Sequence, residues 1–231
     1  MKTRFGFAAT SLLAVAFVMF AGSQAFCGVI SVNMDSWSEA EGFDHQDNPM
    51  LLTEVAGLVP APNWNAYGAG SFHGVTPVDD SGAVTTLAIT GTGGNNSWNT
   101  GGTGTKHMFA DFCSDNGATL DISGVPYANY DLIVYSKSWE ARDMNFSVNG
   151  GDVQTINSGG ESPGSFGDDG ELVEGVHYTT FSGLSGAITL THDHLSGIQI
   201  VEAAAVPEPT TAVLLGLASV LGLSIFTRRR R

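Results

Sequence analysis

Phe146-Ser147-Val148-Asn149-Gly150-Gly151-Asp152-Val153-Gln154-Thr155-Ile156 is the stretch that decides the fold class. Phe146 and Val148 flank a polar residue, the period-two pattern of a strand with one buried face. Asn149-Gly150 follows, and both residue types accept the positive φ angles that a tight hairpin turn requires. Val153–Ile156 supplies the returning strand. The stretch therefore predicts a β-hairpin.

Similar short apolar patterns recur through residues 26–205, at intervals of roughly ten residues. A continuous apolar run at Leu132–Tyr135 suits a central strand, and no stretch carries a convincing helical period. The other predicted strands lie at Ile30–Met34, Ala83–Thr90, Met108–Phe112, Leu120–Ile122, Tyr178–Phe181, Ile188–Leu190 and Ile198–Val201. Ser31 and Asn33 are expected on the solvent side of the first of these. Together the strands predict an all-β sandwich.

Two long segments interrupt this rhythm, Ser36–Gly74 and Gly91–Thr105. Loops of this length are usually functional or disordered. Both contain tryptophan, and aromatic residues favour order because disordered linkers are poor in them. We therefore expect these segments to be ordered.

The first 25 residues have the pattern of a secretory signal peptide. Lys2 and Arg4 precede the apolar run Phe5–Phe20, and Ser23-Gln24-Ala25 places small residues at the two positions that signal peptidase reads. Cleavage is predicted after Ala25, so that residues 26–205 form one exported domain.

Residues 206–231 form a separate tail. Pro207-Glu208-Pro209 precedes the apolar run Thr210–Phe226, which is followed by Arg228, Arg229, Arg230 and Arg231. As a helix the 17-residue run would be about 26 Å long, at ~1.5 Å per residue, the short end for a membrane span. The arginines would remain on the cytoplasmic side. The tail therefore predicts a transmembrane helix over 210–226, with the domain on the far side.

This order of parts resembles the bacterial PEP-CTERM sorting signal: a Pro-Glu-Pro box, one short span and a basic terminus. The resemblance implies that a membrane enzyme, exosortase, recognises the tail at Pro207, Glu208 and Pro209 and cleaves near the box. The implied route leads through the inner membrane to the cell surface or the extracellular matrix. A plain membrane anchor is the alternative.

The exported part is strongly acidic once both flanking segments are set aside. The whole chain has a formal net charge of −14, whereas residues 26–206 hold three basic and 22 acidic residues, a balance of −19. Such a surface repels nucleic acid and anionic lipid, so no nucleic-acid partner is expected.

Several short stretches resemble a β-sandwich module that is common in bacterial PEP-CTERM surface proteins and is similar to galactose-binding-like jelly rolls. They are Ala56–Asn65, Asp80-Ser81-Gly82, Asn95–Trp98, Val125–Asp131, Phe181–Gly186 and Gly197–Val201. The resemblance implies a single jelly-roll-like β-sandwich between the signal peptide and the transmembrane helix. It implies no particular ligand.

Three motifs resemble catalytic or metal sites. Gly160-Glu161-Ser162-Pro163-Gly164 matches a nucleophile elbow, but Pro163 lacks the backbone N–H that an oxyanion hole needs. We interpret His192-Asp193-His194 as a solvated hairpin turn rather than a metal site. Asp168, Asp169, Glu171 and Glu174 are either a plain acidic loop or a calcium site, since Ca²⁺ takes six to eight oxygens. Apart from Ca²⁺, no cofactor is predicted, and no catalytic residue is assigned.

Tryptophans are the candidates for a sugar ligand, because their rings stack on the apolar faces of sugars. Trp64, Trp98 and Trp139 each have amide, hydroxyl or charged neighbours. The alternative is that each anchors a loop to the core, which we favour for Trp64 and Trp98. Cys27 and Cys113 either pair in an oxidising compartment or remain thiols.

The combined features favour an exported, non-enzymatic surface or matrix protein that binds carbohydrate. A polysaccharide hydrolase or lyase is one alternative, since carboxylates are abundant enough to supply a catalytic pair. A purely structural adhesion or matrix protein is the other. The expected partners are signal peptidase, exosortase, the membrane and a polysaccharide.

Overall fold

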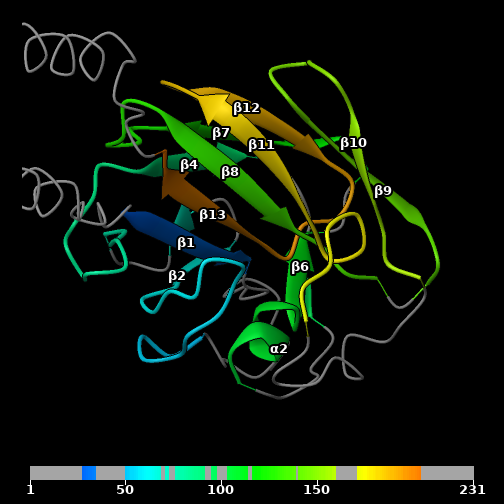
Figure 1. Ribbon diagram of the computed structural model, residues 1–231, viewed down its shortest axis with the longest axis horizontal. Coiled ribbons are helices and arrows are strands. Elements are labelled where there is room, and N and C mark those ends of the chain that lie inside the picture. The colour runs from blue at the N-terminus through cyan, green and yellow to red at the C-terminus, as the bar shows by residue number, and fades with distance from the viewer. Residues whose placement is uncertain are drawn as a thin grey trace, which may run out of the picture.

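The computed structural model describes residues 28–34, 50–68, 71–72, 76–91, 95–97, 103–113, 116–138, 140–159 and 171–203. Within these ranges the chain forms strands β1 to β13 and one helical turn, α2 (Thr105–Met108). The strands make a six-stranded sheet, a five-stranded sheet and a ribbon of β5 (Asn95–Ser97) with β6 (Asp111–Cys113). The two larger sheets pack face to face (Figure 1), which confirms the predicted β-sandwich.

The six-stranded sheet has the order β11-β8-β13-β1-β2-β3. Its neighbours are antiparallel except for the parallel pair β1 and β2. Strand β8 contains the run Leu132–Tyr135 and lies between two partners, as predicted. The bounds are β1 Val29–Met34, β2 Asn65–Gly68, β3 Ser71–Phe72, β8 Tyr130–Tyr135, β11 Tyr178–Leu184 and β13 Gly197–Glu202.

The five-stranded sheet has the order β10-β9-β12-β7-β4 and is antiparallel throughout. The predicted hairpin joins β9 to β10, and Asn149 and Gly150 have φ angles of 53° and 68°. Both residues therefore adopt the positive φ angles that the hairpin turn requires. The bounds are β4 Ala88–Gly91, β7 Ala118–Ser123, β9 Asp143–Val148, β10 Gln154–Asn157 and β12 Ile188–His192.

The main core lies between the two sheets and is built from alternate residues of both. Burial of these aliphatic and aromatic side chains supplies the principal driving force for folding. The six-stranded sheet contributes Ile30, Val32, Met34, Leu132, Val134, Ile198 and Ile200, and the five-stranded sheet contributes Leu120, Ile122, Met144, Phe146, Ile188 and Leu190. Strands β10 and β11 meet along one edge of the sandwich, and β3 meets β4 along the other.

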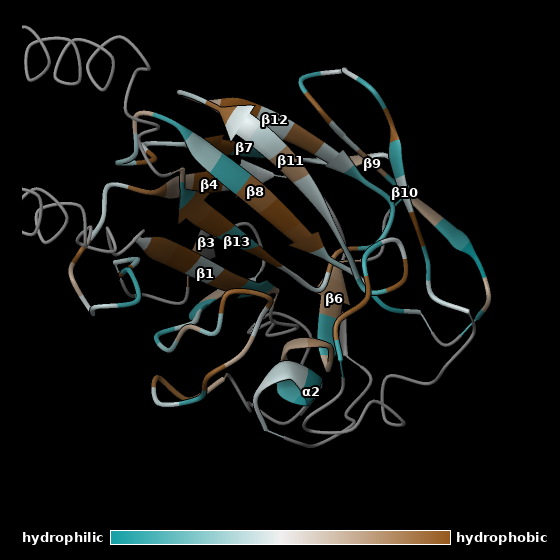
Figure 2. Ribbon diagram, viewed as in Figure 1, coloured by the Kyte–Doolittle hydropathy of each residue, from teal (hydrophilic) through white to brown (hydrophobic). Residues whose placement is uncertain are grey.

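A second apolar cluster covers the outer face of the six-stranded sheet. The segment 50–64 and the turn around α2 place Met50, Ala56, Trp64, Met108 and Phe109 against Ile133 and Tyr135 of β8. Figure 2 shows the apolar strands β1, β8 and β13 with this segment and α2 beside them. The central part of the six-stranded sheet is therefore buried on both faces.

Buried hydrogen bonds hold the segment 50–64 in place. The Tyr135 hydroxyl donates to Gln199 Oε1 and accepts the Leu58 N–H at 2.7 Å. Gln199 Nε2 donates to the Val59 carbonyl at 2.7 Å and to Ser31 Oγ at 3.1 Å. Each polar group of this network is paired, which offsets the cost of burying it.

Three sequence predictions about the strands are wrong in detail. Ser31 and Asn33 do not face solvent, because the second cluster covers their side of β1, and each is 1% exposed. Met108 does not continue a strand through to Phe112, since it ends the helical turn α2 and strand β6 begins at Asp111. The expected strand at Ala83–Thr90 is also shorter, because β4 begins at Ala88.

Candidate functional site

The outer face of the five-stranded sheet differs from its counterpart, because no described element packs on it. Its outward side chains alternate with core residues along every strand, as the period of a strand dictates. We call this surface the polar face. Its members are Ala88, Thr90, Thr119, Asp121, Ser123, Asp143, Asn145, Ser147, Thr155, Asn157, Thr189 and Thr191, each exposed or half-buried.

Small hydrogen-bonding side chains dominate the polar face. All members except Ala88 carry a hydroxyl, an amide or a carboxylate, and none is larger than asparagine or aspartate. The sheet registers place Ser147 and Thr119 on either side of Thr191, and Asp121 beside both Thr189 and Thr90. The surface is thus a grid of polar groups with a spacing of about 4.8 Å between strands.

Asp193, which follows β12, organises one end of the polar face. Its Oδ2 accepts the backbone N–H of Asn145 at 3.0 Å and the side-chain amide of Asn145 at 3.1 Å. Its Oδ1 accepts the Gly117 N–H at 3.2 Å. One half-buried carboxylate therefore connects β9, β12 and the start of β7. Asn145 is held further by the Thr155 hydroxyl, which donates to its Oδ1 at 3.0 Å.

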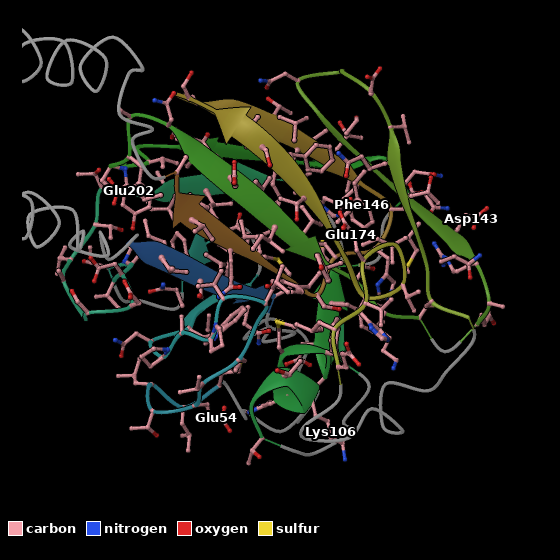
Figure 3. All side chains as sticks on the ribbon, viewed as in Figure 1. Glu54, Lys106, Asp143, Phe146, Glu174 and Glu202 are labelled. Carbon is pink, nitrogen blue, oxygen red and sulfur yellow. The ribbon has the colours of Figure 1, made fainter. Side chains whose placement is uncertain are left out.

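Two other carboxylates of the polar face keep acceptor capacity. Asp121 Oδ1 accepts the Thr189 hydroxyl at 2.6 Å, and Asp143 Oδ1 accepts the Asn157 amide at 2.8 Å. A carboxylate offers about four acceptor positions, so each keeps sites directed to solvent. Figure 3 shows Asp143 at the periphery of the molecule, whereas Phe146 of the same strand lies toward the sheets.

The interpretation of His192-Asp193-His194 as a solvated turn is wrong for both histidines. His192 is fully buried, since it continues the inward-facing series of Ile188 and Leu190 on β12. His194 is 2% exposed and stacks on Phe112, with ring centroids 4.1 Å apart and an interplanar angle of 16°. Only Asp193 reaches the surface. Strand β12 ends at His192, whereas the sequence pattern ends the strand at Leu190.

His194 lies beside Ser136, yet the pair lacks the properties of a nucleophile and its base. Burial, together with Arg142 and His192, lowers the pKa of His194 to about 3. The Ser136 hydroxyl donates to the His194 carbonyl at 2.6 Å and lies 3.4 Å from His194 Nδ1. Ser136 is also fully buried. A base with so low a pKa and a buried hydroxyl cannot perform nucleophilic catalysis on a polymer near neutral pH.

Trp64 is a core residue and does not offer its ring to a ligand. It is 2% exposed, its Nε1 donates to the Ala61 carbonyl at 3.0 Å, and its ring lies 6.3 Å from that of Tyr135. This is the anchoring role favoured by the sequence analysis. Trp98 and Trp139, the other two candidates, lie outside the described residues.

The acidic candidates are only partly described. Glu171 and Glu174 are exposed, while Asp168 and Asp169 lie outside the described residues. Among the residues that the structure describes, no group of three or more histidine, cysteine, aspartate or glutamate side chains has an arrangement suited to a metal ion. Cys113 is 3% exposed, and the question of its pairing stays open because Cys27 also lies outside the described ranges.

The predicted signal peptide, the Pro207-Glu208-Pro209 box, the span 210–226 and Arg228, Arg229, Arg230 and Arg231 lie outside the described residues as well. Within the described part of the chain, no helix has the length and hydrophobicity that are needed to cross a bilayer.

The chain shows only a low structural similarity to known proteins. No protein-family model and no curated protein matches the chain. Two similar solved structures are variants of an exo-β-1,3-galactanase from Phanerochaete chrysosporium with β-1,3-galactotriose. One is 17% identical, with a TM-score of 0.31, and the match covers 52% of this chain and 29% of that chain. The other is also 17% identical, with a TM-score of 0.30, and the match covers 57% and 35%. The chain thus spans about a third of the length of the structures it matches.

The sequence alone did not predict the polar face, although the alternation of polar and apolar residues that produces it can be seen in the sequence. Asp143, Asn145 and Ser147 alternate with buried residues on β9, and Thr189 and Thr191 do so on β12. The alternation indicates an outward face for each strand. It does not reveal that these strands are neighbours, which requires the pairing of β12 with both β9 and β7.

Proposed function

We propose that this chain is an exported, non-enzymatic carbohydrate-binding module that exosortase-type sorting carries to the cell surface or the extracellular matrix. The polar face is the observation that supports carbohydrate binding. A sugar polymer presents hydroxyl groups that both donate and accept hydrogen bonds, and the polar face presents hydroxyls, amides and carboxylates that do the same.

The distribution of apolar residues supports the choice of this face. The six-stranded sheet uses its outer face to pack the segment 50–64, so that surface is occupied by the chain itself. The five-stranded sheet keeps its apolar side chains in the main core and leaves its other face uncovered by described elements. A surface that is rich in fixed polar groups and free of large side chains suits a hydroxylated ligand better than an apolar one.

The sorting part of the proposal rests on the sequence of residues 206–231. One structural feature is compatible with it. The Glu202 N–H donates to the Gly28 carbonyl at 2.9 Å, so the two ends of the described sandwich lie side by side. A signal peptide and a sorting tail would then join the module at neighbouring points. We further propose that the sandwich belongs to the galactose-binding-like jelly rolls.

Affinity electrophoresis of the exported protein tests this function. Native gels would contain neutral, uronic-acid and amino-sugar polysaccharides, one polymer per gel, with bovine serum albumin as a protein that should not be retarded. We expect retardation in at least one polymer, with no release of oligosaccharides from it. Release of reducing ends or unsaturated products would instead support a hydrolase or lyase. Unchanged mobility in every gel would support a purely structural protein.

A further inference from the structure

We infer that the ligand of the polar face is a polysaccharide whose sugar residues carry free, protonated amino groups. The inference rests on the proposed carbohydrate-binding function and names the class of ligand. It follows from the charge of the module, the position of the carboxylates on the polar face and the lack of an exposed aromatic platform among the described members of that face.

The charge of the module favours a cationic partner. Residues 26–206 hold only Lys106, Lys137 and Arg142 against 22 acidic residues. Lys137 is 0% exposed and therefore offers no charge to a partner. The remaining negative potential attracts cations and repels uronic-acid polymers.

The carboxylates are spread along the polar face rather than gathered at one point. Asp121 lies on β7, Asp193 follows β12, and Asp143 begins β9. The registers of β12 with its two neighbours place the three on a diagonal across the sheet. With about 4.8 Å between strands and about 3.3 Å per residue, that diagonal is roughly 20 Å long. An extended polymer of several sugar residues could therefore contact more than one carboxylate.

The groups between these carboxylates suit the hydroxyls of a sugar. Thr189, Thr191 and Ser147 lie along the path, and their side chains are half-buried at the sheet surface. Cross-strand hydrogen bonds already fix Asp121 through Thr189 at 2.6 Å and Asn145 through Thr155 at 3.0 Å. Fixed side chains lose less conformational entropy on binding, which favours affinity. Ammonium groups of the polymer would bind the carboxylates of the protein, and sugar hydroxyls would bind the threonine and serine side chains between those carboxylates.

Ring stacking, the other common means of sugar recognition, is not offered by the described members of this face. Their side chains are no larger than aspartate and asparagine, and Trp64 is buried on the opposite side of the sandwich. Recognition by these described residues would therefore come from hydrogen bonds and charge, and such binding weakens as salt screens the carboxylates.

The test uses one polymer in two chemical forms, partly deacetylated poly-N-acetylglucosamine and the same material after complete N-acetylation. Binding of the exported full protein is measured at pH 6 by titration calorimetry. The face variant is Asp121→Asn with Asp143→Asn. Each change keeps the side-chain shape and an oxygen for the existing hydrogen bond, so folding should be retained. The control variant, Asp152→Asn with Glu171→Gln, removes the same charge from exposed positions outside the polar face.

We expect the parent and the control to bind the amino polymer, and the face variant to bind about tenfold or more weakly, since two charge-assisted contacts are lost. A second variant, Thr191→Gln, places a longer, uncharged side chain in the middle of the path and should also reduce binding. Acetylation of the polymer should abolish binding by the parent.

Several results would overturn the inference. Equal weakening in the face and control variants would show that binding follows net charge alone. Binding of the acetylated polymer as tightly as the amino form, or of a uronic-acid polymer, would leave carbohydrate binding intact and refute the ligand class. Equally tight, face-dependent binding of poly-lysine would refute a sugar ligand. Failure to bind any polysaccharide would refute the proposed function as well.

Discussion

Acidification should destabilise the fold through His194, which is buried and stacked on Phe112. Its pKa is about 3 in the folded protein, against an ordinary value of 6.5, because burial and the nearby Arg142 and His192 disfavour the charged form. Between these two values the unfolded chain binds the proton and the folded chain does not. Stability is therefore lost as the pH falls below about 6.5, and the loss continues toward pH 3.

The magnitude follows from proton linkage. Each pH unit inside this window costs about 1.4 kcal/mol for one such group. Lowering the pH from 6.5 to 4.5 should therefore remove about 2–3 kcal/mol through His194. For a domain of this size, 1 kcal/mol shifts the melting temperature by about 2–4 °C. The expected fall from this residue is then about 5–10 °C.

The assay compares thermal melts of the parent and of His194→Phe at half-unit steps from pH 7 to pH 4.5. Phenylalanine keeps an aromatic ring against Phe112 and cannot take up a proton. Both proteins should lose stability as carboxylates and other histidines titrate, but the parent should lose more by the amount given above. Parallel pH profiles for the two proteins would refute the assignment of a strongly lowered pKa to His194.

Three further predictions concern the core, the buried network and the tail. Trp64→Ala should lower the free energy of unfolding by about 3–5 kcal/mol in a denaturant titration, as other buried aromatic deletions do; a change below 1 kcal/mol would contradict its place in the second cluster. Tyr135→Phe should lower the free energy of unfolding by about 1–3 kcal/mol in the same titration, because the Leu58 N–H loses its acceptor. An unchanged denaturation midpoint would show that the segment 50–64 does not need this hydrogen bond. Replacing Pro207-Glu208-Pro209 by alanines should leave the protein in the inner membrane, measured by fractionation and immunoblotting; normal surface delivery would exclude exosortase sorting.

Strand positions were predictable where one apolar period dominates. Ile30–Met34, Leu120–Ile122 and Ile198–Val201 all lie in observed strands, and the Asn149-Gly150 turn joins the expected pair. These signals are local, because alternation reports which side chains face the core. The sandwich follows from many such strands, so the fold class could be predicted without knowledge of their order.

Burial on the outer side of β1 could not be predicted in the same way. Ser31 and Asn33 are polar and alternate with apolar residues, so the pattern indicates solvent. Their actual environment depends on the segment 50–64, whose position is set by Gln199, a residue 168 positions from Ser31. Contacts of this range leave no periodic trace in the sequence.

The candidate site was predictable only in its chemistry. Tryptophans were the sequence's candidates for a sugar ligand, with a core-anchoring role favoured for Trp64, and Trp64 is buried in the second cluster. The polar face instead arises from strand pairing, which brings β9 and β7 to opposite sides of β12. The sequence reveals each strand's outward residues separately, and only the sheet order joins them into one surface.

Carbohydrate binding by the polar face of the β-sandwich is the proposal on which the others depend. Amide chemical-shift mapping tests it most directly, with the isotope-labelled protein titrated with oligosaccharides of whichever polymer retards it. If this proposal is right, the shifts should be concentrated on β9, β12 and β7, at the amides around Asn145, Thr191 and Asp121. Shifts confined to the segment 50–64 and α2, or no shifts at saturating oligosaccharide, would contradict it.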